Sequence, residues 1–176
     1  MSHELISDVQ TGVHSDAAAA APVGRGRRQP PRAIAWRLPG FGGSARVTTA
    51  FGDLPIHALR RRDPLRTLGG TQRMVHWCDR LRLDQGFLAA NPDAQPILIQ
   101  ANALGHGVPK ADILVSPHQP ISVTPPSFRP EFRLARDLTG RPGVLRRPEE
   151  TMAYYLFHCE EPTVVFVEGV AVSITP

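Results

Sequence analysis

The sequence is poor in several residue types, and each scarcity excludes a class of protein. Cysteine occurs twice in 176 residues, as Cys78 and Cys159, with no Cys-x-x-C pair. A disulfide-rich scaffold, a zinc knuckle or a thioredoxin-type site is therefore not expected. We expect two free thiols, with a single disulfide as the alternative. No run of about 18 or more apolar residues occurs, which excludes a membrane-spanning helix.

Lysine is nearly absent as well. Lys110 is the only lysine, so arginine supplies almost all of the 20 basic residues. The net charge is +4 and the isoelectric point is near 9.8, a balance that permits weak binding of anions. Because the arginines are scattered along the chain, they do not indicate a nucleic-acid-binding protein.

Residues 1–35 contain almost no large apolar side chains. Such a segment cannot offset the entropy lost on ordering, so it is predicted to be a flexible Ala/Pro/Arg-rich tail. Its basic stretch, Arg25 to Arg32, could make a weak contact with an anionic partner. The segment does not resemble a secretory signal, because its alanine run is short and the arginines follow that run. We therefore expect a cytoplasmic protein, with export by a signal-less route as an open alternative.

Residues 36–176 are predicted to form one all-β domain. The chain holds 18 prolines and 15 glycines, which separate short runs of β-branched and apolar residues. Helical turns are expected only at 131–138 and 149–157, and Trp77 is expected in the core. The predicted strands cover 45–49, 65–68, 74–77, 97–99, 113–115, 121–123, 163–167 and 170–174.

One pair of residues has the character of metal ligands. His76 and Cys78 are two positions apart, so on a strand they share a face. His57, His106 or His158 could act as remote partners. Nothing in the sequence fixes the remaining ligands, so we expect no metal and no cofactor.

Five short strings follow one another between residue 40 and the end of the chain. They are Arg46-Val47-Thr48-Thr49 with Leu54-Pro55-Ile56, then Val75-His76-Trp77, then Asp112-Ile113-Leu114-Val115-Ser116-Pro117, then Ala135-Arg136-Asp137-Leu138, and finally Tyr154 with Val164-Val165-Phe166-Val167-Glu168-Gly169. In this order they resemble the bacterial branch of the Hint (hedgehog/intein) superfamily. The resemblance implies a compact, mostly antiparallel, horseshoe-like β domain with internal pseudo-two-fold symmetry.

The resemblance also implies a chemistry. Hint domains cleave or rearrange the peptide bond before their first residue, a cysteine or, less often, a serine, whose side chain attacks the preceding carbonyl. The matching position here is Gly40, which has no nucleophile. A family histidine that protonates the departing amide nitrogen follows a serine or threonine by three residues. Here Ser116 is kept and Gln119 takes the histidine position, and a further family histidine is matched by Pro162.

The matched positions predict a degenerate domain that keeps the apolar framework and loses the reactive groups. His118 lies one residue before Gln119, and a shift of one residue on a strand turns a side chain to the opposite face. It is therefore expected to be a surface or capping histidine. We expect a monomeric structural or interaction module with a possible protein partner, and an enzyme activity is not favoured.

Two alternatives stay open. In the first, Ser44 replaces the nucleophile, with His118 as a substitute histidine, and self-cleavage survives near residues 39–44. Hydrogen bonding within a turn is the simpler explanation for Ser44. In the second, residues 25–32 dock an anionic partner and the β domain is only the scaffold.

Overall fold

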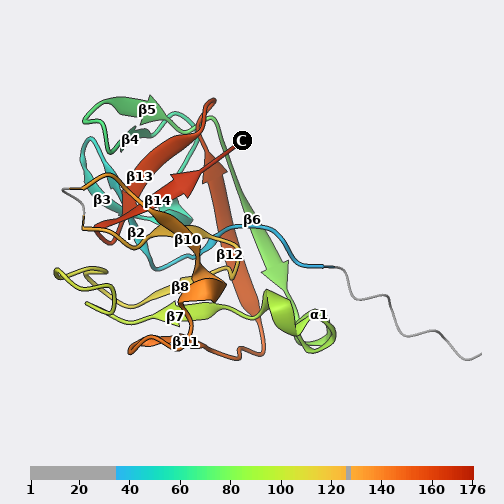
Figure 1. Ribbon diagram of the computed structural model, residues 1–176. Coiled ribbons are helices and arrows are strands. Elements are labelled where there is room, and N and C mark those ends of the chain that lie inside the picture. The colour runs from blue at the N-terminus through green and yellow to red at the C-terminus, as the bar shows by residue number, and fades with distance from the viewer. Residues whose placement is uncertain (1–34, 126–127) are drawn as a thin grey trace, which may run out of the picture. The chain divides into compact units, whose positions relative to one another are not determined.

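The computed structural model describes residues 35–125 and 128–176 (Figure 1). Except for Ala35, the predicted tail and its Arg25–Arg32 contact lie outside the described residues. The rest is almost entirely antiparallel β-structure, which confirms the predicted all-β class. None of the described helices is long and apolar enough to cross a membrane.

The described strands form two sheets in which all paired neighbours run antiparallel. The first sheet has the order β11 (Val144–Arg146), β7 (Ile97–Ile99), β8 (Ile113–Val115), β1 (Phe41–Gly42), β12 (Met152–His158) and β6 (Trp77–Leu83). The second has the order β10 (Phe132–Leu134), β9 (Pro120–Ser122), β14 (Val170–Ile174), β13 (Thr163–Val167), β2 (Arg46–Thr49), β4 (Pro64–Arg66) and β5 (Gln72–Met74). The strand β3 (Gly52–Pro55) pairs with β2 beside this path.

The helical elements are short, and three of the four described ones, η1 (Ile56–Ala58), α1 (Gln85–Ala90) and η2 (Pro92–Ala94), were not expected. The fourth is η3 (Ala135–Leu138). Helix α1 begins after Asp84, whose carboxylate accepts a hydrogen bond from the Phe87 amide at 2.8 Å. Residues 131–138 contain η3, but β10 takes their first part.

The expectation of a helix at 149–157 is wrong, because this segment contains β12. Every residue of β12 pairs with β6, from Met152 opposite Leu83 to His158 opposite Trp77 (Figure 1). The two adjacent tyrosines of this segment favour a strand, and pairing with the long strand β6 stabilises that conformation. The expectation of a core position for Trp77 is also wrong, since this side chain is 41% exposed at the start of the edge strand β6.

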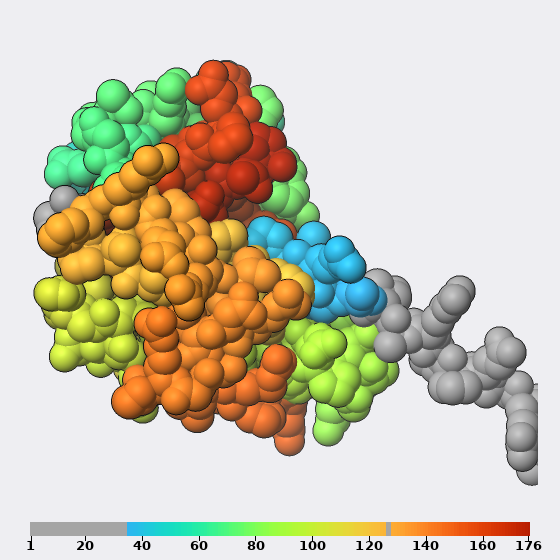
Figure 2. All heavy atoms as spheres, viewed as in Figure 1, coloured from blue at the N-terminus to red at the C-terminus, as the bar shows by residue number. Residues whose placement is uncertain are grey.

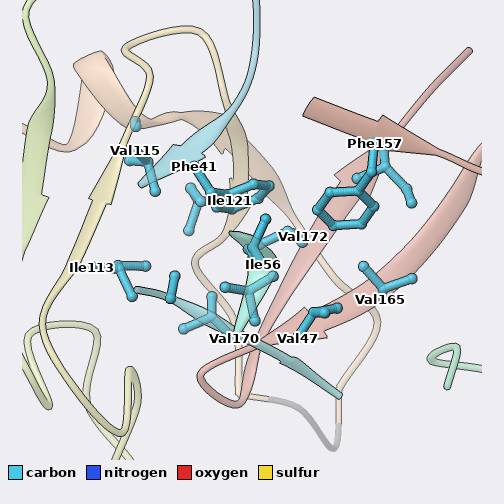
Figure 3. Packing of buried hydrophobic residues seen from close by; sticks show 14 of the residues in the cluster. Phe41, Val47, Ile56, Ile113, Val115, Ile121, Phe157, Val165, Val170 and Val172 are labelled. Carbon is cyan, nitrogen blue, oxygen red and sulfur yellow. The ribbon is translucent and has the colours of Figure 1, made fainter. Parts of the chain in front are cut away.

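The hydrophobic core takes side chains from both sheets. Phe41 and Phe157 come from the first sheet, and their rings lie 5.9 Å apart. Val47, Ile121 and Val172 come from the second sheet and pack in the same cluster (Figure 3). A smaller cluster surrounds Trp36 and contains Leu83, Leu88, Ala94, Met152 and Tyr154. These residues bring the segment before β1 into the domain, beside α1 and β12.

Candidate functional site

Gly40 directly precedes β1. Both its backbone conformation and the small space around its Cα suit glycine. It is buried and its φ angle is +148°. A Cβ atom added there would lie 3.2 Å from Cβ of Tyr154 and 3.3 Å from the carbonyl oxygen of Tyr155. The second of these contacts is with backbone, which cannot rotate away. A larger residue at position 40 therefore requires the strands to move.

Gln119 contacts the amide nitrogen of Gly40. Its side chain is 1% exposed, and its Oε1 accepts a hydrogen bond from the Gly40 N–H at 3.2 Å. Its Nε2 donates to the carbonyl oxygens of Ser173 at 3.1 Å and Pro120 at 3.2 Å. These contacts fix the orientation of the side-chain amide. The Gly40 N–H requires an acceptor oxygen, and the carbonyls of Ser173 and Pro120 require the donor nitrogen. The side chain holds the nitrogen of the Pro39–Gly40 bond, but a neutral amide carries no proton that it can release near neutral pH.

Ser116 anchors the chain on both sides of the same peptide bond. It is fully buried, its N–H donates to the Gly40 carbonyl at 2.8 Å, and its Oγ donates to the Leu38 carbonyl. The Oγ also accepts a hydrogen bond from the indole N–H of Trp36 at 3.0 Å. Ser116 thus positions the segment from Trp36 to Gly40 along the end of β8.

His118 lies in a turn that the Gln119 amide closes onto the Ser116 carbonyl at 3.0 Å. It is half-buried, and its Nε2 lies 3.5 Å from a guanidinium nitrogen of Arg136. Desolvation by burial, followed by the charges of Arg136 and Arg37, lowers the pKa of His118 below its ordinary value of 6.5. Gln119, rather than His118, makes the contact with the Gly40 amide.

The structure does not bring Pro162 to this group. Pro162 lies between β12 and β13, where it lines a separate hollow with Thr67 and Thr163. Gly40, Ser116 and Gln119 therefore assemble into one site, and Pro162 stays outside it.

Ser44 lies in the exposed turn between β1 and β2. The carbonyl before it, that of Gly43, accepts a hydrogen bond from the His57 N–H at 3.2 Å and lies 2.8 Å from His57 Nδ1. No sequence pattern predicts this contact, because the β2–β3 hairpin separates the two residues. The role of Trp36 was not predicted either, although a tryptophan four residues before Gly40 could have indicated that this segment packs on the domain.

His76 and Cys78 do not form the metal site that their spacing suggested. Nδ1 of His76 lies 3.4 Å from a carboxylate oxygen of Glu160, whereas Sγ of Cys78 lies 3.7 Å from the Leu59 carbonyl. Over residues 35–125 and 128–176, no group of three or more His, Cys, Asp or Glu side chains is arranged to hold a metal ion.

Two antiparallel sheets share a core, and a buried polar side chain holds the amide at the start of the first strand. The model of the Hint domain family matches residues 39–174, so the chain belongs to this family.

Solved intein structures share the fold at very low sequence identity. A DnaB intein from Synechocystis sp. PCC 6803 has 7% identity and a TM-score of 0.53, with 79% of this chain and 100% of the intein covered. The Ssp DnaB mini-intein variant M86 has 7% identity and a TM-score of 0.54, with 81% and 99% covered. The MchDnaB-1 intein has 10% identity and a TM-score of 0.51, with 75% and 98% covered. No curated protein matches the chain.

Proposed function

We propose that this Hint domain does not process itself and serves as a folded interaction module. The observation that carries the proposal is Gly40, which stands where the family's chemistry requires a nucleophile. Without a hydroxyl or thiol on the residue that carries the scissile amide, no five-membered ring can form with the preceding carbonyl. The acyl shift that begins self-cleavage therefore has no first step at the Pro39–Gly40 bond.

The contact of Gln119 supports the same proposal. General acid catalysis needs a group whose proton is available near neutral pH. Gln119 holds the Gly40 nitrogen at 3.2 Å but supplies no such proton. Its two further hydrogen bonds, to Pro120 and Ser173, give it a structural role, because it joins the residue before β1 to β9 and β14 at a buried point.

The burial of Trp36 gives a third line of support. Trp36 lies upstream of the Pro39–Gly40 bond, yet it is only 7% exposed. Its ring lies 5.5 Å from that of Tyr154 and 6.1 Å from that of Phe87. A segment packed in this way is part of the domain's own structure, which suits a domain that keeps this segment attached.

The test introduces the missing thiol alone. Gly40→Cys should give almost no fragment when it is incubated with excess thiol, because Gln119 cannot protonate the departing nitrogen. Gly52→Cys is the matched control, since Gly52 also has a positive φ, of +114°, but has no atom within 4 Å of an added Cβ. Efficient thiol-induced cleavage of Gly40→Cys, with the control intact, would show that the rest of the reactive site survives and would overturn the proposal.

One observation favours a second candidate function, self-cleavage at the Gly43–Ser44 bond. The Ser44 hydroxyl would attack the Gly43 carbonyl carbon, the amide C–N bond would break to leave a free amine on Ser44, and water would hydrolyse the resulting ester. The backbone N–H of His57 donates to the Gly43 oxygen at 3.2 Å, and the ring Nδ1 lies 2.8 Å from the same oxygen. With its proton on Nδ1, the ring would add a side-chain donor that stabilises negative charge there.

Ser44→Ala and His57→Gln separate this candidate from the first. A fragment beginning at Ser44 in the unaltered protein, lost in Ser44→Ala and reduced in His57→Gln, would establish it. Cleavage that persists in Ser44→Ala would show that Ser44 is not the nucleophile. Our main proposal predicts no such fragment in any of the three proteins.

A further inference from the structure

A cavity of about 660 Å³ opens beside Gly40, between the segment that enters β1 and the end of β14. In the space-filling view, the entering segment (blue) lies next to the C-terminal residues (red) (Figure 2). The ends of β6 and β12 complete the wall. This volume lies within the range of roughly 300–1,000 Å³ that is usual for small-molecule sites.

The wall of the cavity is largely apolar and includes an exposed aromatic ring. Leu156 and Ile174 line it together with Trp77. Trp77 is 41% exposed, and its ring stacks on that of His158 with centroids 5.4 Å apart. The stack holds the indole in place, so the surface that it presents is already ordered before any ligand arrives.

The side chains of the lining that can carry a charge near neutral pH are all basic. Arg37, His76, His118 and His158 line the cavity, and none of the lining side chains is an aspartate or a glutamate. Outside the lining, Glu160 pairs with His76 at 3.4 Å and Asp137 pairs with Arg136 at 3.5 Å. Arg136 itself faces His118 at 3.5 Å. Arg136 and Arg37 act on His118 more strongly than Asp93 and Asp137 do, so this part of the rim has a positive potential and suits an anion.

The geometry points to a binding site for a small carboxylic acid with an apolar or aromatic body. The carboxylate lies at the rim formed by Arg37 and His118, and the body lies against Trp77, Leu156 and Ile174. This inference rests on the proposed function, because the space is free for a ligand only when the domain does not use it for its own peptide chemistry. It adds a ligand class to the interaction module.

The test compares 3-phenylpropionate with 3-phenylpropionamide, which differ only in the charged group. Titration of the full chain, followed by tryptophan fluorescence and by calorimetry, should show the acid binding about tenfold more tightly than the amide, as expected when an anion meets a cationic rim. Trp77→Phe should remove most of the fluorescence change and should also weaken the binding measured by calorimetry, because it replaces part of the apolar wall. Equal binding of acid and amide, or binding of neither, would overturn the inference.

Two arginine variants test whether Arg37 supplies the positive charge that binds the carboxylate. Arg37→Gln should weaken binding of the acid roughly fivefold while binding of the amide stays the same. Arg66→Gln is the matched control, because Arg66 is exposed on β4 away from the cavity and should bind as the unaltered protein does. Unchanged affinity in Arg37→Gln, or equal losses in both variants, would contradict the assigned rim.

Further experiments distinguish a small acid from a peptide C-terminus as the ligand. They also show which of the two proposals a negative result refutes. Tighter binding of a short peptide with a free C-terminal phenylalanine than of 3-phenylpropionate would overturn the assignment to a small molecule. Thr175 and Pro176 also line the cavity, so a chain extended by two glycines should retain the preference for the acid. The intact mass is measured after each titration. A cleaved chain refutes the proposed function, whereas an intact chain without acid preference refutes this inference alone.

Discussion

Two peptide bonds near β1 each have part of a self-cleaving site, and they differ in which part. At Pro39–Gly40 the amide nitrogen is buried and held by Gln119, but the residue has no nucleophile. At Gly43–Ser44 a hydroxyl is present and His57 contacts the carbonyl, but the serine is exposed in a turn. Cleavage needs the nucleophile, the proton donor and the oriented carbonyl at one bond. We propose that their separation here leaves this Hint domain without the Hint reaction.

The largest expected effect concerns the chain upstream of Gly40. Trp36→Ala should lower the free energy of unfolding by about 3 kcal/mol, as is typical for truncating a buried aromatic side chain. It also leaves the Ser116 hydroxyl without the indole donor. Phe51→Ala is the matched control, because Phe51 is 90% exposed, and it should change the stability by less than about 0.5 kcal/mol. Urea denaturation measures both. Equal small effects would mean that the upstream segment is not part of the fold.

The next prediction compares the loss of stability on removing Gln119, which contacts the Pro39–Gly40 bond, with the loss on removing His57, which contacts the Gly43–Ser44 bond. Gln119→Ala should cost about 2–3 kcal/mol, because it leaves the Gly40 N–H and the Ser173 carbonyl buried without their partner. His57→Ala should cost less than about 1 kcal/mol, since water can replace an exposed imidazole. Urea denaturation of both variants measures the two losses of stability. A greater loss for His57→Ala would reverse the comparison.

A somewhat smaller effect separates crowding from backbone conformation at Gly40. Gly40→Ala should cost about 2 kcal/mol, because it combines a positive φ with contacts to Tyr154 and Tyr155. Gly52→Ala also has a positive φ but no atom near its added Cβ, so it should cost about 1 kcal/mol. Thermal unfolding of both variants gives the difference. If the two variants lose the same stability, crowding at Gly40 is unimportant.

The smallest effect is the pH dependence that His118 contributes. Burial, then Arg136 and Arg37, lower its pKa in the folded chain, so the unfolded chain takes up this proton first as the pH falls below 6.5. Protonation therefore favours the unfolded state below that pH. His118→Gln should show a smaller drop in Tm than the unaltered protein between about pH 7.5 and about pH 5.5. A larger drop in the variant would mean that the folded state stabilises the protonated ring.

The fold class could be predicted from the sequence, because β-branched runs and family strings are local features. Ser116 and Gln119 hydrogen-bond Gly40, while the assignment of these three residues to the family's reactive positions stays a prediction. Other features depend on tertiary partners that no local pattern reveals. The strand at 152–158 exists because β6 pairs along its whole length, and Trp77 is exposed because β6 is an edge strand. The same reason hid the contact of Trp36 with Ser116, which lie 80 residues apart.

The most direct test of the account is the intact mass of the unaltered full-length protein. The protein is measured when freshly purified under non-reducing conditions and again after incubation with excess thiol. The account predicts one species at the full-length mass of about 19.2 kDa in both samples. A shortened species whose new N-terminus lies between Gly40 and Ser44 would contradict it.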